Sequence, residues 1–161
     1  MFEFLHQTAL DLVNQYGLIG LFLVSCIGTS IIPIPVEAAV LFIRVFGYDS
    51  VAVGLTAGLG SGFGSMINYY IGFFFGKKID KISKRSGFLE KLRERFKKSG
   101  FFWVFFSALT PLPYDVFTIA AGFLHYNPLL FLIASILGRT IRFTLIAYFG
   151  EVALKIFLPT L

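Results

Sequence analysis

The stretch Ile31-Ile32-Pro33-Ile34-Pro35-Val36-Glu37 decides the fold, and it has an echo in Leu109-Thr110-Pro111-Leu112-Pro113-Tyr114-Asp115. In both copies Pro-x-Pro interrupts an apolar run, and an acidic residue follows two positions after the second proline. Proline lacks a backbone donor and clashes with the preceding turn, so each run is expected to break into two half-helices. Broken backbone at membrane depth persists only where protein or a water-filled cavity satisfies it. Two such breaks at matching places predict a transport site near the bilayer midplane.

The composition is that of an integral membrane protein. Of the 161 residues, 57% are hydrophobic and only 14% are charged, whereas a soluble domain carries about 25% charged residues. The length allows a single domain over residues 1–161, and we expect an all-α polytopic protein of the cell membrane. Cys26 is the single cysteine and lies in an apolar segment. A disulfide, a CxxC redox pair and a thiolate metal site are therefore excluded, and Cys26 is interpreted as a packing residue.

Positive charge is concentrated in one short segment. Ten of the 14 Lys and Arg residues lie between Lys77 and Lys98. The positive-inside rule places such a segment, between two apolar runs, in the cytoplasm, where anionic lipid headgroups are its natural contacts. No aromatic-interleaved basic platform accompanies the charge, which argues against nucleic-acid binding.

The lengths of the apolar runs distinguish full spans from hairpins. One span needs about 20 residues and two spans need about 40, but the broken run at residues 17–46 fits neither length. We therefore expect a re-entrant hairpin of two half-helices that enters and leaves on the same side. The other expected segments are an interfacial amphipathic helix at 2–15, spans at 51–76 and about 129–153, a basic amphipathic surface helix within the loop 77–98, and a second broken run at 101–124.

The two halves of the chain resemble each other. The first Pro-x-Pro-x-acid motif matches the second at an offset of 78, and the first span matches the last at an offset of 74, as in Gly64 and Gly138. Each half, about 17–76 and about 101–157, would contain one broken hairpin and one span. With one crossing per half, the halves form an inverted repeat whose Pro-x-Pro tips meet near the centre. Both termini are then expected to face outward.

Glu37 and Asp115 are the acidic residues expected at membrane depth, where an ionisable group costs at least about 2.5 kcal/mol. One interpretation is structural, because a carboxylate in the first turn of a second half-helix favours the helix dipole and accepts from free N–H groups. The other is a proton-coupling site. The two interpretations are compatible, and the sequence leaves both open.

Arg139 and Arg142 lie well inside the last span and share one helix face at i and i+3. They either neutralise Glu37 and Asp115 or bind an anionic headgroup, since the guanidinium fork suits phosphate. Within the first span, Ser65 is a candidate cavity-lining residue.

Asn68, also on the first span, and Tyr114, at the second tip, are further cavity-lining candidates. The glycine-rich character of the first span indicates tight helix packing, and the same close approach would bring its backbone to a ligand. We find no nucleophile with a base, no metal-ligand spacing and no phosphate-binding glycine loop. The sequence therefore predicts no enzyme, no cofactor and no metal.

These residues resemble the DedA family, also called SNARE-associated or VTT-domain membrane proteins, and its short YqaA-like branch in particular. Pro33-Ile34-Pro35-Val36-Glu37 is similar to the first hairpin tip of that family, and Thr110-Pro111-Leu112-Pro113-Tyr114-Asp115 with Ala121-Gly122 to the second. Gly64-Ser65-Met66-Ile67-Asn68-Tyr69-Tyr70-Ile71-Gly72 resembles its Gly-Asp-x-x-Gly-Tyr-x-x-Gly segment. The resemblance implies two opposed re-entrant hairpins and lipid scrambling or flipping, including recycling of polyprenyl-phosphate carriers, coupled to protons.

The chain departs from that family at the second tip. Many members carry Arg three residues before and three residues after the tip proline, where this chain has Ala108 and Tyr114, and Ser65 replaces an Asp. Arg139 and Arg142 are candidates to supply the missing charge from the last span.

We therefore predict a transporter or scramblase-like protein that moves an anionic lipid or lipid-linked phosphate between leaflets. Its expected partners are membrane lipids and protons, and a homo-oligomer is compatible with the sequence. The alternative is a non-transporting membrane scaffold that binds partner proteins.

Overall fold

The structure, a computed structural model, describes residues 11–30, 35–82, 87–110 and 114–157. Within these ranges the chain is helical apart from short turns, and it contains no strand. Residues 11–16 form a first helical segment. The longer helices are α2 (Leu18–Gly28), α3 (Val36–Val45), α4 (Ser50–Ile82), α5 (Gly87–Leu109), α6 (Tyr114–Phe123) and α7 (Pro128–Phe157).

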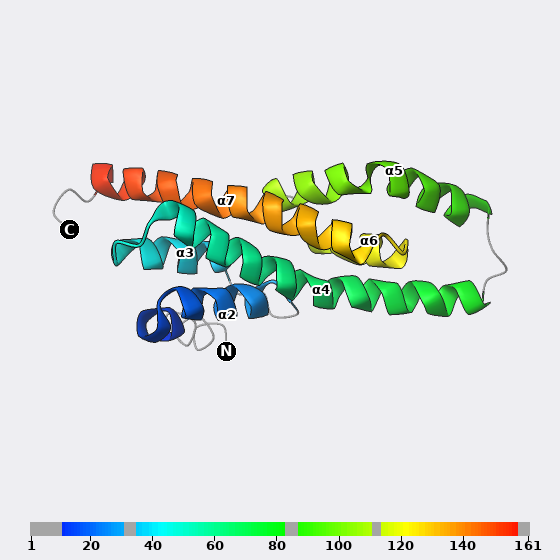
Figure 1. Cartoon of the computed structure of the whole chain (residues 1–161), viewed down its shortest axis with the longest axis horizontal. Coiled ribbons are helices and arrows are strands. Elements are labelled where there is room, and N and C mark those ends of the chain that lie inside the picture. The colour runs from blue at the N-terminus through cyan, green and yellow to red at the C-terminus, as the bar shows by residue number, and fades with distance from the viewer. Residues whose placement is uncertain (1–10, 31–34, 83–86, 111–113, 158–161) are drawn as a thin grey trace.

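Helices α4 and α7 form the axis of the molecule. They run in opposite directions along its long dimension and cross near the middle (Figure 1). The hairpin arms α2 and α3 lie in one half of the molecule, whereas α5 and α6 lie in the other, and the C-terminal end of α5 reaches the middle. Both α3 and α6 begin near the middle and run outward in opposite directions. Over Ser50–Lys78 and Pro128–Gly150, α4 and α7 are long and apolar enough to cross a membrane.

The helix boundaries recur along the chain. Helices α3 and α6 both have 10 residues and begin 78 positions apart, and α4 and α7 also begin 78 positions apart. Asp49 Oδ2 accepts from the first backbone N–H groups of α4 at 2.9 and 3.1 Å. Asn127 Oδ1, 78 positions later, does the same for α7 at 2.9 and 3.2 Å. These side chains satisfy donors that a helix start leaves unpaired.

The turns before these caps are also equivalent. Gly47 has φ 81°, and His125, again 78 positions later, has φ 56°. Both are left-handed conformations that end the preceding half-helix. The first arms of the hairpins, α2 and α5, end just before Thr29 and Thr110. The hydroxyl groups of these two threonines donate to carbonyl oxygens of the preceding turn, at 2.8 and 2.7 Å. The same local chemistry therefore ends the first arm of each hairpin.

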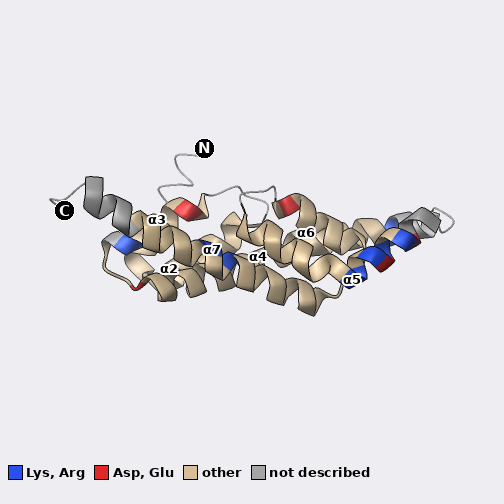
Figure 2. Ribbon diagram, turned by 90° about the horizontal axis from the view of Figure 1, so that it is seen from above, with Lys and Arg blue, Asp and Glu red and all other residues tan. Residues whose placement is uncertain are grey.

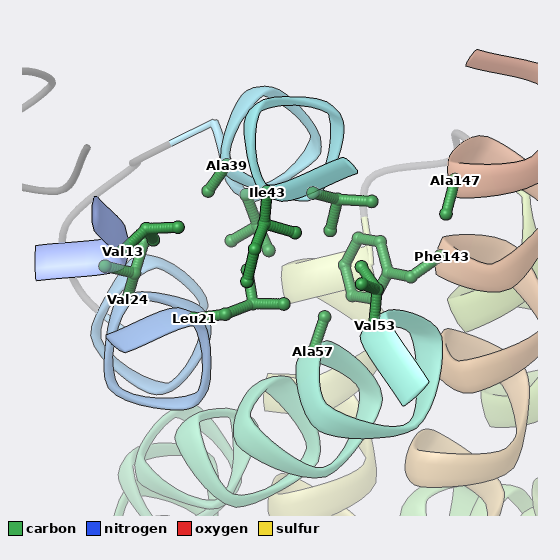
Figure 3. Packing of buried hydrophobic residues seen from close by; sticks show 11 residues of the cluster. Val13, Leu21, Val24, Ala39, Ile43, Val53, Ala57, Phe143 and Ala147 are labelled. Carbon is green, nitrogen blue, oxygen red and sulfur yellow. The ribbon is translucent and has the colours of Figure 1, made fainter. Parts of the chain in front are cut away.

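The buried residues form two hydrophobic cores, one for each hairpin. The first joins α2 and α3 to the beginning of α4 and the later part of α7, and Figure 3 shows Leu21, Ile43, Val53 and Phe143 meeting there. The second joins the end of α5 and α6 to the later part of α4 and the beginning of α7, around Tyr69. Each hairpin is therefore packed against both long helices.

Glycines permit the close crossing of α4 and α7. A methyl group on Gly54 would overlap Thr144, and one on Gly58 would overlap Thr140. The expected close packing of the glycine-rich span against the hairpins is observed at Gly64, which meets the backbone of α2, and at Gly72, which meets that of α6.

The basic segment 77–98 differs from the expected separate surface helix. Its residues up to Ile82 continue α4, and those from Gly87 onward begin α5, which runs without a break into the second apolar run. Figure 2 shows basic positions along the N-terminal part of α5. The physical reason is that the segment has no proline, and lysines near the end of α4 favour its continuation through the helix dipole.

Several predicted features lie outside the described residues. These are Pro33, Pro111 and Pro113 of the hairpin breaks and most of the expected N-terminal interfacial helix. Pro35 is described and is the residue that precedes the first turn of α3, with φ −70°.

Candidate functional site

Arg142 connects α7 to both hairpins. Its Nη2 donates to Glu37 Oε1 at 2.7 Å, and its Nη1 donates to the carbonyl oxygen of Thr110 at 3.3 Å. Glu37 lies in the first turn of α3, as expected, and Thr110 directly follows α5. The side chain of Arg142 is 20% exposed and that of Glu37 is 41% exposed. The Arg142 guanidinium therefore contacts Glu37 in the first hairpin and the end of α5, the first arm of the second hairpin.

Asn68 makes the corresponding contacts from α4. Its Nδ2 lies 3.2 Å from the carbonyl oxygens of Thr29 and Ser30, which directly follow α2. The same nitrogen lies 3.2 Å from Asp115 Oδ1, and Asp115 lies in the first turn of α6. Asn68 is buried and Asp115 is exposed. The predicted cavity-lining amide and the predicted acid are thus direct neighbours.

Arg139 lies one turn before Arg142 on α7 and has different surroundings. Only 8% of the residue is exposed. Its guanidinium carbon lies 4.2 Å from the ring centroid of Tyr114 and 5.9 Å from that of Phe143. Among the described residues its Nε has no hydrogen-bond partner. The cation is therefore covered by aromatic rings, which stabilise a desolvated cation.

Tyr114 is held in place over Arg139. Its hydroxyl donates to Ser135 Oγ at 2.6 Å, and Ser135 in turn donates to the carbonyl oxygen of Phe131 at 2.8 Å. All three side chains are buried. The first residue of α6 is thus fixed to α7, and its ring is part of the second hydrophobic core as well as a contact of the guanidinium.

The structure brings most of the predicted site residues together at the centre of the molecule. Ser65 takes no part in these contacts: it is buried, and its hydroxyl donates to the Gly62 carbonyl oxygen within α4 at 2.7 Å. Figure 2 shows acidic positions near the starts of α3 and α6 on one face of the molecule. In the described residues no group of three or more His, Cys, Asp or Glu could hold a metal ion.

Sequence reasoning missed two parts of the site. It missed Ser135, for which no sequence signal exists, since a serine in an apolar helix is common. It also missed that Asn68 corresponds to Arg142 within the repeat. The signal was present, because the offset of 74 that relates Gly64 to Gly138 also relates these two residues.

Comparisons with known proteins place this chain in a family. An uncharacterised protein of Methanocaldococcus jannaschii is 28% identical over 147 residues, which cover 87% of this chain and 88% of that protein. An uncharacterised protein of Haemophilus influenzae is 32% identical over 85 residues, 51% of this chain and 44% of that protein. No solved structure matches. The VTT domain matches residues 32–152, a range from the first tip to near the end of α7. The chain is therefore a membrane protein of the VTT-domain, or DedA, family.

Proposed function

We propose that this protein moves an anionic lipid, or a lipid-linked phosphate, between the two leaflets of the membrane. The headgroup would bind at the centre of the molecule, between the starts of α3 and α6. Arg139 is the proposed anion ligand, and Arg142 orders the surrounding hairpins.

The observation that carries this proposal is the deep burial of the Arg139 guanidinium together with the unpaired state of its Nε among the described residues. An arginine at the centre of a membrane helix costs about 2.5–3.5 kcal/mol even on insertion scales. Arg142 offsets that cost through its ion pair with Glu37. Arg139 is more deeply buried, and its Nε is unpaired among the described residues. A cation kept in this position without an acceptor at Nε is suited to an anionic ligand.

The position of Arg139 also fits the departure from the family motif. Tyr114 stands where many family members carry an Arg, and the Arg139 guanidinium lies over the ring of Tyr114. The last span therefore supplies a cation close to the place where the motif lacks one. A guanidinium at this point has the planar fork that phosphate oxygens accept from in pairs.

The arrangement of the hairpins favours alternating access over a fixed scaffold. The two cores, the equivalent caps and the opposite directions of α3 and α6 support the proposed inverted repeat with re-entrant hairpins. In transporters built this way, substrate sites lie near the midplane between the repeats. Coupling to protons through Glu37 or Asp115 belongs to the same proposal.

The test is lipid movement in proteoliposomes. We expect purified protein to move a fluorescent phosphate-bearing lipid between leaflets, and Arg139→Lys to abolish that movement while thermal unfolding in detergent stays close to wild type. A lysine keeps the charge but not the fork. Arg95→Lys, on the polar part of α5, is the matched control and should retain full transport.

Two results would contradict the proposal. Full transport by Arg139→Lys would make Arg139 a structural cation only. Absence of lipid movement by folded wild-type protein, over a range of anionic lipids, would favour the alternative of a membrane scaffold.

A further inference from the structure

Asn68 and Arg142 make corresponding contacts from the two long helices, although Arg142 lies about one turn nearer to the start of α7 than Asn68 does to the start of α4. They lie 74 positions apart, the offset at which the first span matches the last. Each donates to carbonyl oxygen at the end of the first arm of its own hairpin: Asn68 to Thr29 and Ser30, and Arg142 to Thr110. Thr29 and Thr110 are themselves equivalent, because each donates its hydroxyl to the preceding turn.

The second contact of each residue reaches the opposite hairpin. Asn68 on α4 donates to Asp115 at the start of α6, and Arg142 on α7 donates to Glu37 at the start of α3. The two contacts join residues 47 and 105 positions apart in sequence. The two sets of contacts therefore follow the same pattern. In each, a donor on a long helix links the first arm of its own hairpin to the acidic residue of the opposite hairpin.

We propose that Asn68 is a positioning residue which, together with Arg142, forms a pair of reciprocal cross-ties between the two hairpins. Each tie joins one hairpin arm to the acid of the opposite hairpin, so neither hairpin moves without the other. Releasing one tie loosens both hairpins.

The two ties differ in strength. Arg142 and Glu37 form a charge-assisted pair at 2.7 Å, whereas Asn68 is a neutral amide whose single nitrogen is shared among three acceptors at 3.2 Å. The Arg142–Glu37 contact is short and carries charge on both partners, whereas in the Asn68 contacts only the Asp115 carboxylate is charged and all three distances are longer. The Asn68 tie is consequently the one that yields first. Its part in transport rests on the proposed function, but the tie itself is testable without a lipid substrate.

The chain offers a matched pair of reporters for the test. Cys26 is half-buried on α2, three positions before Thr29. Ser107 is buried on α5, three positions before Thr110. Maleimide labelling of native Cys26 reports on the first hairpin. Labelling of Ser107→Cys in a Cys26→Ser background reports on the second.

We expect Asn68→Asp to raise the labelling rate at both reporters by about tenfold, because the variant loses the shared donor and faces Asp115 with a second carboxylate. Asn68→Leu removes the donor without adding charge and should raise both rates in the same direction. Adding Asp115→Asn to Asn68→Asp restores an amide donor between the two positions. This double variant should return labelling at Ser107→Cys towards the wild-type rate.

Thr56→Val is the matched control, since the Thr56 hydroxyl donates to the Ala52 carbonyl oxygen within α4. It should leave both labelling rates unchanged. Unchanged labelling in both Asn68 variants would overturn the proposal. A response at Cys26 alone, or no rescue by Asp115→Asn, would reduce Asn68 to a local contact of the first hairpin. Since labelling needs no transport, these outcomes are independent of whether the wild type moves lipid.

Discussion

Glu37 and Asp115 occupy equivalent positions at the starts of α3 and α6, yet they have different partners. Glu37 is paired with a cation, Arg142, whereas Asp115 accepts from a neutral amide, Asn68. The sequence left open whether these acids cap half-helices or exchange protons. The observed contacts join each acid to the long helix of the other half of the chain, which favours a role in positioning the hairpins.

At this scale we expect Glu37→Gln and Asp115→Asn to impair lipid movement more than folding. Each amide keeps a carbonyl oxygen that accepts from Arg142 or Asn68, but neither can exchange a proton near neutral pH. Glu37→Gln should be the less stable variant, by about 1.5–3 kcal/mol, because it leaves the half-buried Arg142 without a counter-charge.

The measurement is transport in proteoliposomes across a range of pH, together with thermal unfolding of the same preparations. Unaltered transport with the wild-type pH dependence in both variants would remove proton coupling and leave the acids with a structural role alone.

At the scale of helices, backbone contacts at glycine decide how closely α4 can approach its neighbours. Gly72 faces the backbone carbonyl oxygen of Ile119 on α6, and Gly64 faces that of Cys26 on α2. Gly122 on α6 faces the backbone of α4 in return, at Tyr69. Close approach at these points brings the start of α6 within reach of Asn68. The contact between Asn68 and Asp115 therefore depends on the close packing of α4 and α6 at their glycines.

We expect Gly72→Ala to destabilise the protein by about 1–3 kcal/mol, because the added methyl group overlaps a backbone oxygen that cannot move independently. Gly150→Ala is the matched control: its methyl group would meet only the end of the flexible Leu41 side chain. Both changes raise helix propensity equally, so thermal unfolding in detergent isolates the packing cost. Equal stability of the two variants would show that the α4–α6 contact is not tight.

At the scale of the whole molecule, the antiparallel arrangement of α4 and α7 separates the basic region from the C-terminal end of α7. The end of α4 and the beginning of α5 lie at one end of the long dimension, and α7 ends at the other (Figure 1). With the basic region in the cytoplasm, α4 and α7 as single crossings and both hairpins re-entrant, the chain termini should face outward.

Single cysteines introduced at Glu3, Lys98 and Thr160 in a Cys26→Ser background provide the measurement. A membrane-impermeant maleimide applied from outside should label the first and third, whereas the cysteine at Lys98 should require access to the cytoplasm. Labelling of both termini from the cytoplasmic side alone would replace the re-entrant hairpins with full crossings.

Much of the secondary structure follows from local chemistry that the sequence displays. Pro-x-Pro predicts the two interruptions because proline cannot continue a helix. The observed helices α2 and α3, and α5 and α6, lie on either side of those positions. The short intervals left between the expected runs and spans, at 47–50 and 125–128, coincide with the places where α4 and α7 begin. The basic segment was harder to predict, since an amphipathic surface helix and the ends of two long helices have the same local pattern.

The sequence by itself determined which residues needed a partner: two acids and two arginines in apolar segments, where an unpaired charge is costly. Only the tertiary structure decided how they were paired. Arg139 and Arg142 share a helix face, but one reaches Glu37 and the other lies against Tyr114. Those contacts depend on where α4 and α7 cross and how each hairpin packs on them. The crossing is a property of interhelical packing at Gly54, Gly58 and their neighbours, which local sequence patterns do not encode.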